Sequence, residues 1–142
     1  DLTIELPAVT PADLAAPARG ETTDTVAARV AAARDAQADR ISAFEGETKA
    51  LSNAALNDAD LSKVATPDAE GANLLSRAAE ALSLSARAYT RILRVARTLA
   101  DLDGAGGVRR RHIAEAVSFR RRESAGPAGA IMASDRAAVV SN

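Results

Sequence analysis

The sequence lacks cysteine and is poor in aromatic residues, and each shortage excludes a class of protein. Without cysteine the chain has no disulfides, no thiolate metal site and no cysteine nucleophile. Its aromatic residues are Phe44, Tyr89 and Phe119, so the core must come from aliphatic side chains on closely spaced helices. This composition predicts an all-α fold.

Long hydrophobic runs are also missing. No apolar stretch approaches the roughly 20 residues that a membrane-spanning helix needs, and the N-terminus lacks the charged-then-apolar order of a signal peptide. We therefore expect a cytoplasmic protein with no membrane partner.

The motifs of a self-sufficient enzyme are missing as well. Gly104 to Gly107 is glycine-rich, but no Lys-Ser or Lys-Thr follows it and no strand precedes it, which predicts a turn rather than a phosphate loop. Asp58 and Asp60 have no further ligand at metal-binding spacing. His112, the one histidine, has Glu115 one helical turn further along the sequence, and we expect it to have a structural or surface role. We expect no catalytic residue, no metal site and no bound cofactor in this chain by itself.

Charge is distributed unevenly along the chain. The formal net charge is −1, yet residues 1–76 carry net −7 and residues 77–142 carry net +6. The basic half is the part suited to phosphate groups, although the two halves could instead pack together and complement each other.

One amphipathic helix organises the sequence, from Leu84 to Gly104. Ser85 can accept hydrogen bonds from the first turn, and Gly104 can adopt the left-handed conformation that ends a helix. One face carries Tyr89, Ile92, Leu93, Ala96, Leu99 and Ala100; the other carries Arg87, Arg91, Arg94 and Arg97. From spacing alone, this arginine stripe is typical of a solvated helix face.

The remaining segments complete a small bundle of four to five helices over residues 22–122. Val26 and Val30 are expected to face inward on a helix that Thr22 or Thr23 caps. Thr66 and Pro67 predict the start of the helix that should form a hairpin with the organising helix. Further helices are predicted within 47–65, as one or two short ones, and over 108–120. Residues 1–21 comprise an unpaired strand-like segment and an extended linker, and 123–142 a disordered tail.

The sequences of three segments resemble those of a known family. Residues 85–102 read Ser-Ala-Arg-Ala-Tyr-Thr-Arg-Ile-Leu-Arg-Val-Ala-Arg-Thr-Leu-Ala-Asp-Leu, and residues 112–120 read His-Ile-Ala-Glu-Ala-Val-Ser-Phe-Arg. Residues 26–37 carry the phrase Val-x-x-Arg-Val-x-x-Ala-Arg-x-x-Gln. All three resemble the C-terminal lid of the magnesium-chelatase-like AAA+ ATPases of the ComM/YifB type.

The resemblance implies a part of a larger ATPase. Its core, with the phosphate loop, ATP and Mg²⁺, would lie upstream, and the strand-like residues 1–7 would be the remnant of that core's last strand. Arg87 would be the sensor-2 arginine that reaches the ATP phosphates, while Arg91, Arg29 and Arg34 would be phosphate or subunit contacts. The parent would assemble as a homo-oligomeric ring, expected to be a hexamer, acting on DNA as in branch migration. This fragment alone should not hydrolyse ATP.

Two other classes stay open from the sequence. A small helical nucleic-acid-binding module would use two arginine triplets on the phosphate backbone, although the chain lacks stacking aromatics and a positive net charge. The triplets are Arg109, Arg110 and Arg111, and Arg120, Arg121 and Arg122. The lid of a true magnesium chelatase subunit is the other alternative, but no tetrapyrrole-binding feature is evident.

Overall fold

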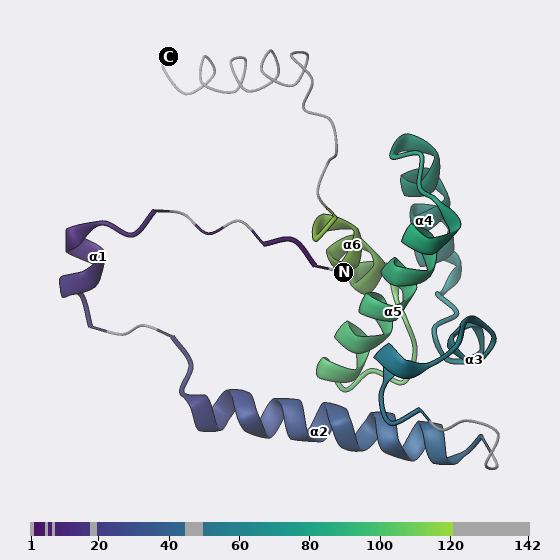
Figure 1. Ribbon diagram of the computed structural model, residues 1–142, viewed down its shortest axis with the longest axis horizontal. Coiled ribbons are helices and arrows are strands. Elements are labelled where there is room, and N and C mark those ends of the chain that lie inside the picture. Colours follow the sequence, from purple (N-terminus) through teal and green to yellow (C-terminus); the bar gives the residue numbers. More distant parts are fainter. Residues whose placement is uncertain (1, 5, 7, 18–19, 45–49, 121–142) are drawn as a thin grey trace.

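The computed structural model describes residues 2–4, 6, 8–17, 20–44 and 50–120, and this part of the chain is helical without a strand (Figure 1). The elements are α1 (Pro11–Ala15), α2 (Thr23–Ser42), the 3₁₀ turn η1 (Asn53–Ala55), α3 (Asp58–Val64), α4 (Ala69–Ala81), α5 (Ala86–Leu102) and α6 (Arg110–Ser118). The predicted all-α class is confirmed, with α2 to α6 forming the bundle. The predicted tail over 123–142 lies outside the described residues.

Helix α5 is the central element of the bundle. It packs against α6 on one side and α2 on another, with α3 and η1 against its remaining surface. The predicted hairpin of α4 with α5 is wrong, because α4 packs mainly against α6. The connection from α4 to α5 contains Ser83, whose φ of 47° is left-handed.

The core is built from small and aliphatic side chains, as the shortage of aromatic residues predicts. Alanines on α5 lie at the contacts, where a small side chain lets neighbouring helices approach closely. The buried cluster consists of Ile41, Ala50, Leu56, Leu61, Ala65, Leu75, Ile92, Ala96, Ala100, Val108, Ile113 and Ala116.

Side-chain caps define the helix ends, mostly where the sequence predicts them. Ser85 accepts from the Ala88 amide at 3.2 Å, and Gly104 has a φ of 63°. Helix α4, however, is not capped by Thr66. Asp68 caps it and accepts from the Gly71 amide at 2.7 Å, while the Thr66 hydroxyl donates to the Ser62 carbonyl at 2.7 Å and closes α3. The Pro67 prediction fails by two residues because Pro67 forms a β-bridge with Val108.

The described residues before α2 are called the N-terminal arm below, and they contain a helix where the sequence predicts an extended linker. Thr10 caps α1 by accepting from the Asp13 amide at 3.2 Å, and Asp13 accepts in return from the Thr10 amide at 2.9 Å. Pro11 fits because the first helical position needs no amide donor. The described residues before Pro7 form no strand, but the Thr3 amide donates to the Phe119 carbonyl at 3.0 Å.

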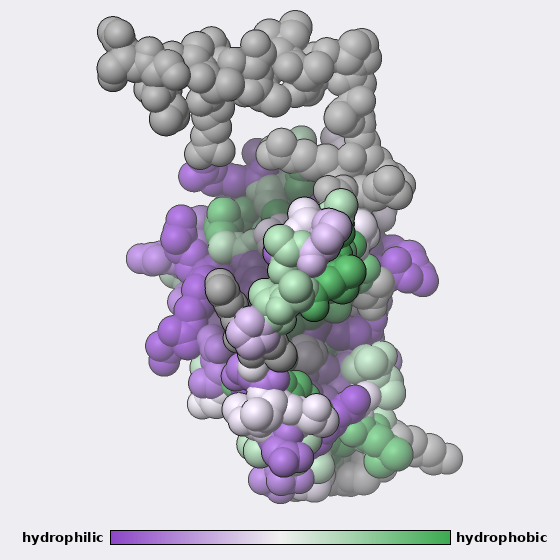
Figure 2. Space-filling view, turned by 90° about the vertical axis from the view of Figure 1, so that its left-hand side faces the viewer, coloured by the Kyte–Doolittle hydropathy of each residue, from purple (hydrophilic) through white to green (hydrophobic). Residues whose placement is uncertain are grey.

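Hydrophobic side chains on α2 and α5 are more exposed than the sequence predicts. Val26 and Val30 were expected to face inward, yet they are 38% and 43% exposed, because the first half of α2 extends beyond the bundle (Figure 1). The face that carries α1 and the start of α2 shows hydrophobic patches among hydrophilic ones (Figure 2). Tyr89, predicted to pack inward, is also 38% exposed.

Candidate functional site

The arginine stripe of α5 divides into two environments. Its first three members, Arg87, Arg91 and Arg94, line an open depression of about 310 Å³ together with Asp58, Ala86 and Thr90. This set of six residues is called the arginine depression below. Arg97 was predicted to lie on the same polar face, but it is buried, with 1% of its surface exposed. Arg97 shares the helix face as predicted, but this face is not solvated there, because the end of α3 and the segment after α5 cover the last turns of the helix.

Two features make the arginine depression positive. Its lining contains three arginines and one aspartate. Ala86 and Arg87 are the first two residues of α5, where the free amides and the helix dipole add a partial positive charge. This combination is suited to binding an anionic group.

Arg94 is the anchored member of the arginine depression. It donates to the Leu56 carbonyl at 3.0 Å and lies 3.7 Å from a carboxylate oxygen of Asp58. The Arg94 side chain is 20% exposed, and its Nε is buried without a hydrogen-bond partner among the described residues. Arg87, in contrast, is exposed at the helix start, so its side chain can reach outward.

Arg97 holds together the base of the bundle. Its guanidinium donates to Asp101 at 2.8 Å and 3.1 Å, and also to the backbone carbonyls of Ala105, Gly106 and Val64. Burial lowers the pKa of the Arg97 guanidinium; the nearby charge of Arg40 acts in the same direction, whereas Asp101 raises it. A buried arginine is tolerable here because a carboxylate and several carbonyls satisfy its donors.

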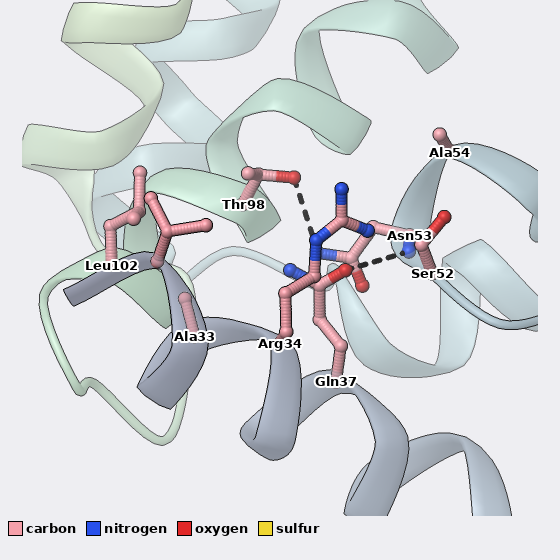
Figure 3. A pocket seen from close by; sticks show the side chains of 9 residues that line it. Ala33, Arg34, Gln37, Ser52, Asn53, Ala54, Thr98 and Leu102 are labelled. Carbon is pink, nitrogen blue, oxygen red and sulfur yellow. Dashed lines mark hydrogen bonds between the residues drawn. The ribbon is translucent and has the colours of Figure 1, made fainter. Parts of the chain in front are cut away.

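Asp101 extends this network to α2 and η1. The Arg40 guanidinium forms an ion pair with it, and the Asn53 side-chain amide donates to it at 2.7 Å. Asn53 also links Gln37 of α2 to Thr98 of α5, as the dashed lines in Figure 3 show. These contacts border a second depression of about 260 Å³ between α2, η1 and α5.

The two candidate arginines of α2 lie away from the arginine depression. Arg29 forms a two-pronged ion pair with Glu21, both N–O distances being 2.9 Å. The hydrogen bond from Arg29, and then its charge, lowers the pKa of Glu21. Arg34 lines the second depression (Figure 3). The structure therefore does not bring either residue together with Arg87.

The arginine triplet before α6 does not gather in one place. Arg110 lines another small depression with Glu70 and Arg77, whereas Arg111 pairs with Asp103 at 3.2 Å. Arg109 occupies the N-cap position of α6. The triplet is therefore spread over different partners.

His112 has the structural role that was expected. It is buried, and its Nδ1 accepts from the Arg109 amide at 3.0 Å. Its Nε2 lies 3.0 Å from a carboxylate oxygen of Asp103 and 3.1 Å from the Arg111 Nε. His112 thus ties the start of α6 to the segment after α5.

Two features are absent from the part of the chain that the structure describes. Within 2–4, 6, 8–17, 20–44 and 50–120, no helix is long and apolar enough to cross a membrane. In the same ranges, no three or more His, Cys, Asp or Glu side chains gather so that they could hold a metal ion.

Comparison with known proteins identifies the class to which this fold and its arginine-bearing helix belong. Residues 20–120 match the family described as magnesium chelatase, subunit ChlI C-terminal. The chain belongs to this family.

Particular relatives point to one branch of that family. The chain is 37% identical to YifB of Escherichia coli strain K12, 36% identical to competence protein ComM of Haemophilus influenzae, and 38% identical to YifB of Salmonella typhimurium. Each match extends over 121 residues, which cover 84% of this chain and 22% of the relative. The resemblance to the C-terminal domain of ComM/YifB proteins is thus confirmed, and the chain spans about a fifth of their length.

Sequence reasoning found part of the site and missed the rest. It singled out Arg87 and Arg91, but it considered Asp58 only as a metal ligand, rejected that role, and did not associate Asp58 with Arg94. The missing information was tertiary, since Asp58 and Arg94 come from different helices. The Arg97–Asp101 pair had a local signal, the spacing of four residues within a helix, but this spacing is equally common on exposed faces.

Proposed function

We propose that this chain is the C-terminal lid of a magnesium-chelatase-like AAA+ ATPase, and that Arg87 contacts the phosphates of ATP held by an upstream core. The observation that carries the proposal is the arginine depression, where three guanidinium groups and the start of a long helix meet. Membership of the magnesium chelatase C-terminal family supports it.

The chemistry of Arg87 suits this role. A guanidinium binds phosphate oxygens in pairs and stays charged at any working pH. Its position in the first turn of α5 adds the attraction of the helix N-terminus for anions. Bound ATP would supply the phosphoryl group, and the part of Arg87 would be to fix and stabilise negative charge on it.

The residues of this chain fit the phosphates of ATP but not its metal ion. No cluster of three or more ligating side chains exists among the described residues, so Mg²⁺ and the phosphate loop would belong to the upstream core. The lid would respond to the loss of a phosphate by moving relative to that core, because a charge-dependent contact disappears.

The proposal extends to the whole parent protein. We infer a homo-oligomeric ring, expected to be a hexamer, in which lid motion is transmitted between subunits. One relative is a competence protein, and this supports a role in DNA processing such as branch migration during natural transformation. A cytoplasmic location agrees with these roles.

Substituting Arg87 in the full-length parent tests the proposal. Arg87→Ala should remove a charge-assisted contact of roughly 1.5–3 kcal/mol and lower ATP turnover at least about tenfold. Folding should be unaffected, because Arg87 is exposed and exposed substitutions usually change stability by no more than about 0.5 kcal/mol. Steady-state ATP hydrolysis and thermal unfolding give the two readouts.

Arg77→Ala is the matched control. Arg77 is an exposed arginine on α4 and lines a different depression, so its loss should leave ATP turnover unchanged. Arg94 is unsuitable as a control, because it shares the arginine depression with Arg87. Equal loss of turnover in the Arg77 and Arg87 variants would show a general charge effect and refute the specific role of Arg87.

A further inference from the structure

The arginine depression contains a negative charge of its own, and this charge is weakly held. Asp58 is the first residue of α3, its side chain is 79% exposed, and its carboxylate lies 3.7 Å from the Arg94 guanidinium. An ion pair at this distance with one solvated partner contributes little to stability. The carboxylate can therefore move away at small cost.

Arg94 differs from Asp58 in being fixed. Its hydrogen bond to the Leu56 carbonyl and its low exposure hold the guanidinium at the wall of the depression. Such a fixed cation is ready to bind an anion, since little side-chain freedom remains to be lost. What occupies it in the structure is the solvated carboxylate of Asp58.

We propose that Asp58 is a built-in competitor for the phosphate site. It pairs with Arg94 when the arginine depression is empty of anions, and an entering polyphosphate displaces it, so that Arg94 becomes a second phosphate contact beside Arg87. The affinity of the site for a polyphosphate thus depends on how much more strongly the polyphosphate binds the Arg94 guanidinium than Asp58 does. This inference rests on the proposed function, because it assigns Arg94 and Asp58 to the same phosphate site as Arg87.

The shape of the site favours a short polyphosphate over a nucleic acid backbone. Arg87, Arg91 and Arg94 all come from α5, and the first and last of them are seven residues apart, about 10 Å along the helix axis. A compact anion can contact these guanidinium groups over this distance, whereas an extended strand would continue beyond them.

Titration of this chain with inorganic triphosphate at low ionic strength tests the inference, with backbone amide NMR shifts as the readout. Shifts should be concentrated at the start of α5 and at Asp58. Asp58→Asn should lower the dissociation constant about two- to fivefold, the range expected for removing one exposed ion pair. Arg94→Ala should raise it at least about fivefold.

Asp35→Asn is the matched control for net charge. Asp35 is an exposed carboxylate on α2, outside the arginine depression, and its substitution changes the charge by the same amount as Asp58→Asn. The dissociation constant should stay at the wild-type value. An equal gain in both variants would show a general charge effect and overturn the inference.

Three further results would overturn it. These are an unchanged affinity in the Asp58 variant, the absence of saturable shifts at the depression in both wild type and variant, and equally good competition by a short DNA duplex. The proposed function is judged separately, by ATP turnover of the Arg87 variant in the full-length parent. If that turnover falls while Asp58→Asn leaves triphosphate binding unchanged, only the competitor role fails.

Discussion

Arg97 and Arg94 belong to the same helix face, yet burial gives them different tasks. Arg97 is enclosed and donates to Asp101 and to backbone carbonyls. Arg94, one turn earlier, remains partly exposed at the arginine depression. At the residue scale, therefore, the contacts around a guanidinium decide whether it stabilises the fold or faces a ligand.

Removing the buried carboxylate should be costly. Asp101→Ala would leave Arg97 buried without a counter-charge and would also deprive Arg40 and Asn53 of their partner. We expect the free energy of unfolding to fall by about 3–5 kcal/mol, the usual cost of breaking a buried ion pair. Urea unfolding followed by circular dichroism measures it. Asp35→Ala on the exposed face of α2 should cost less than about 0.5 kcal/mol, and a similar small loss for Asp101→Ala would contradict the network's structural role.

Gly71 of α4 lies against the start of α6. A Cβ atom at this position would lie 3.1 Å from the Pro67 Cβ, 3.3 Å from the Arg110 backbone nitrogen and 2.9 Å from a carboxylate oxygen of Asp68. The Asp68 carboxylate cannot simply rotate away, because it caps α4 by accepting from the Gly71 amide. At the element scale, the absence of a side chain thus permits both the cap and the packing of α4 on α6.

Gly71→Ala should reverse the usual effect of this substitution. Alanine in place of glycine ordinarily stabilises a helix by about 1 kcal/mol, but here the clash should outweigh that gain and destabilise the chain by about 1–3 kcal/mol. Thermal unfolding gives the sign directly. Gly107→Ala is the control, since a Cβ atom added at Gly107 would meet nothing within 4 Å; a stabilised Gly71 variant would show that α4 and α6 can separate at no cost.

At the scale of the whole molecule, the described part of the chain comprises a packed bundle and an N-terminal arm with few contacts to it. Helix α1 contains no buried residue, and an isolated helix of this length is marginal in water. A hydrogen bond from the Thr3 amide to the Phe119 carbonyl connects the arm to the end of α6. Stability should therefore reside in residues 22–120.

Hydrogen exchange should separate these two parts. Amides of α5 from residue 88 to 100 should exchange slowly, because they lie at the centre of the core, whereas amides of residues 2–16 should exchange close to the unfolded rate. Mass spectrometry of exchanged peptides provides the measurement. Comparable protection in both segments would mean that the N-terminal arm is an integral part of the domain.

The sequence alone determined the helical class and the ends of α5, and it limited the cap of α2 to Thr22 or Thr23. These features depend on local chemistry, namely Ser85 and Thr22 as caps and Gly104 as a left-handed residue. The sequence of residues 85–102 also indicated the magnesium chelatase C-terminal family, to which the chain belongs.

Only the tertiary structure decided which parts of each helix are covered. Val26 and Arg97 both follow the helical period. Val26 is exposed because the first half of α2 extends beyond the bundle. Arg97 is buried because the end of α3 and the segment after α5 cover it. The approach of Asp58 to Arg94 likewise joins two helices. A helical period states which residues share a face, but the burial of that face depends on neighbours that lie far away in the sequence.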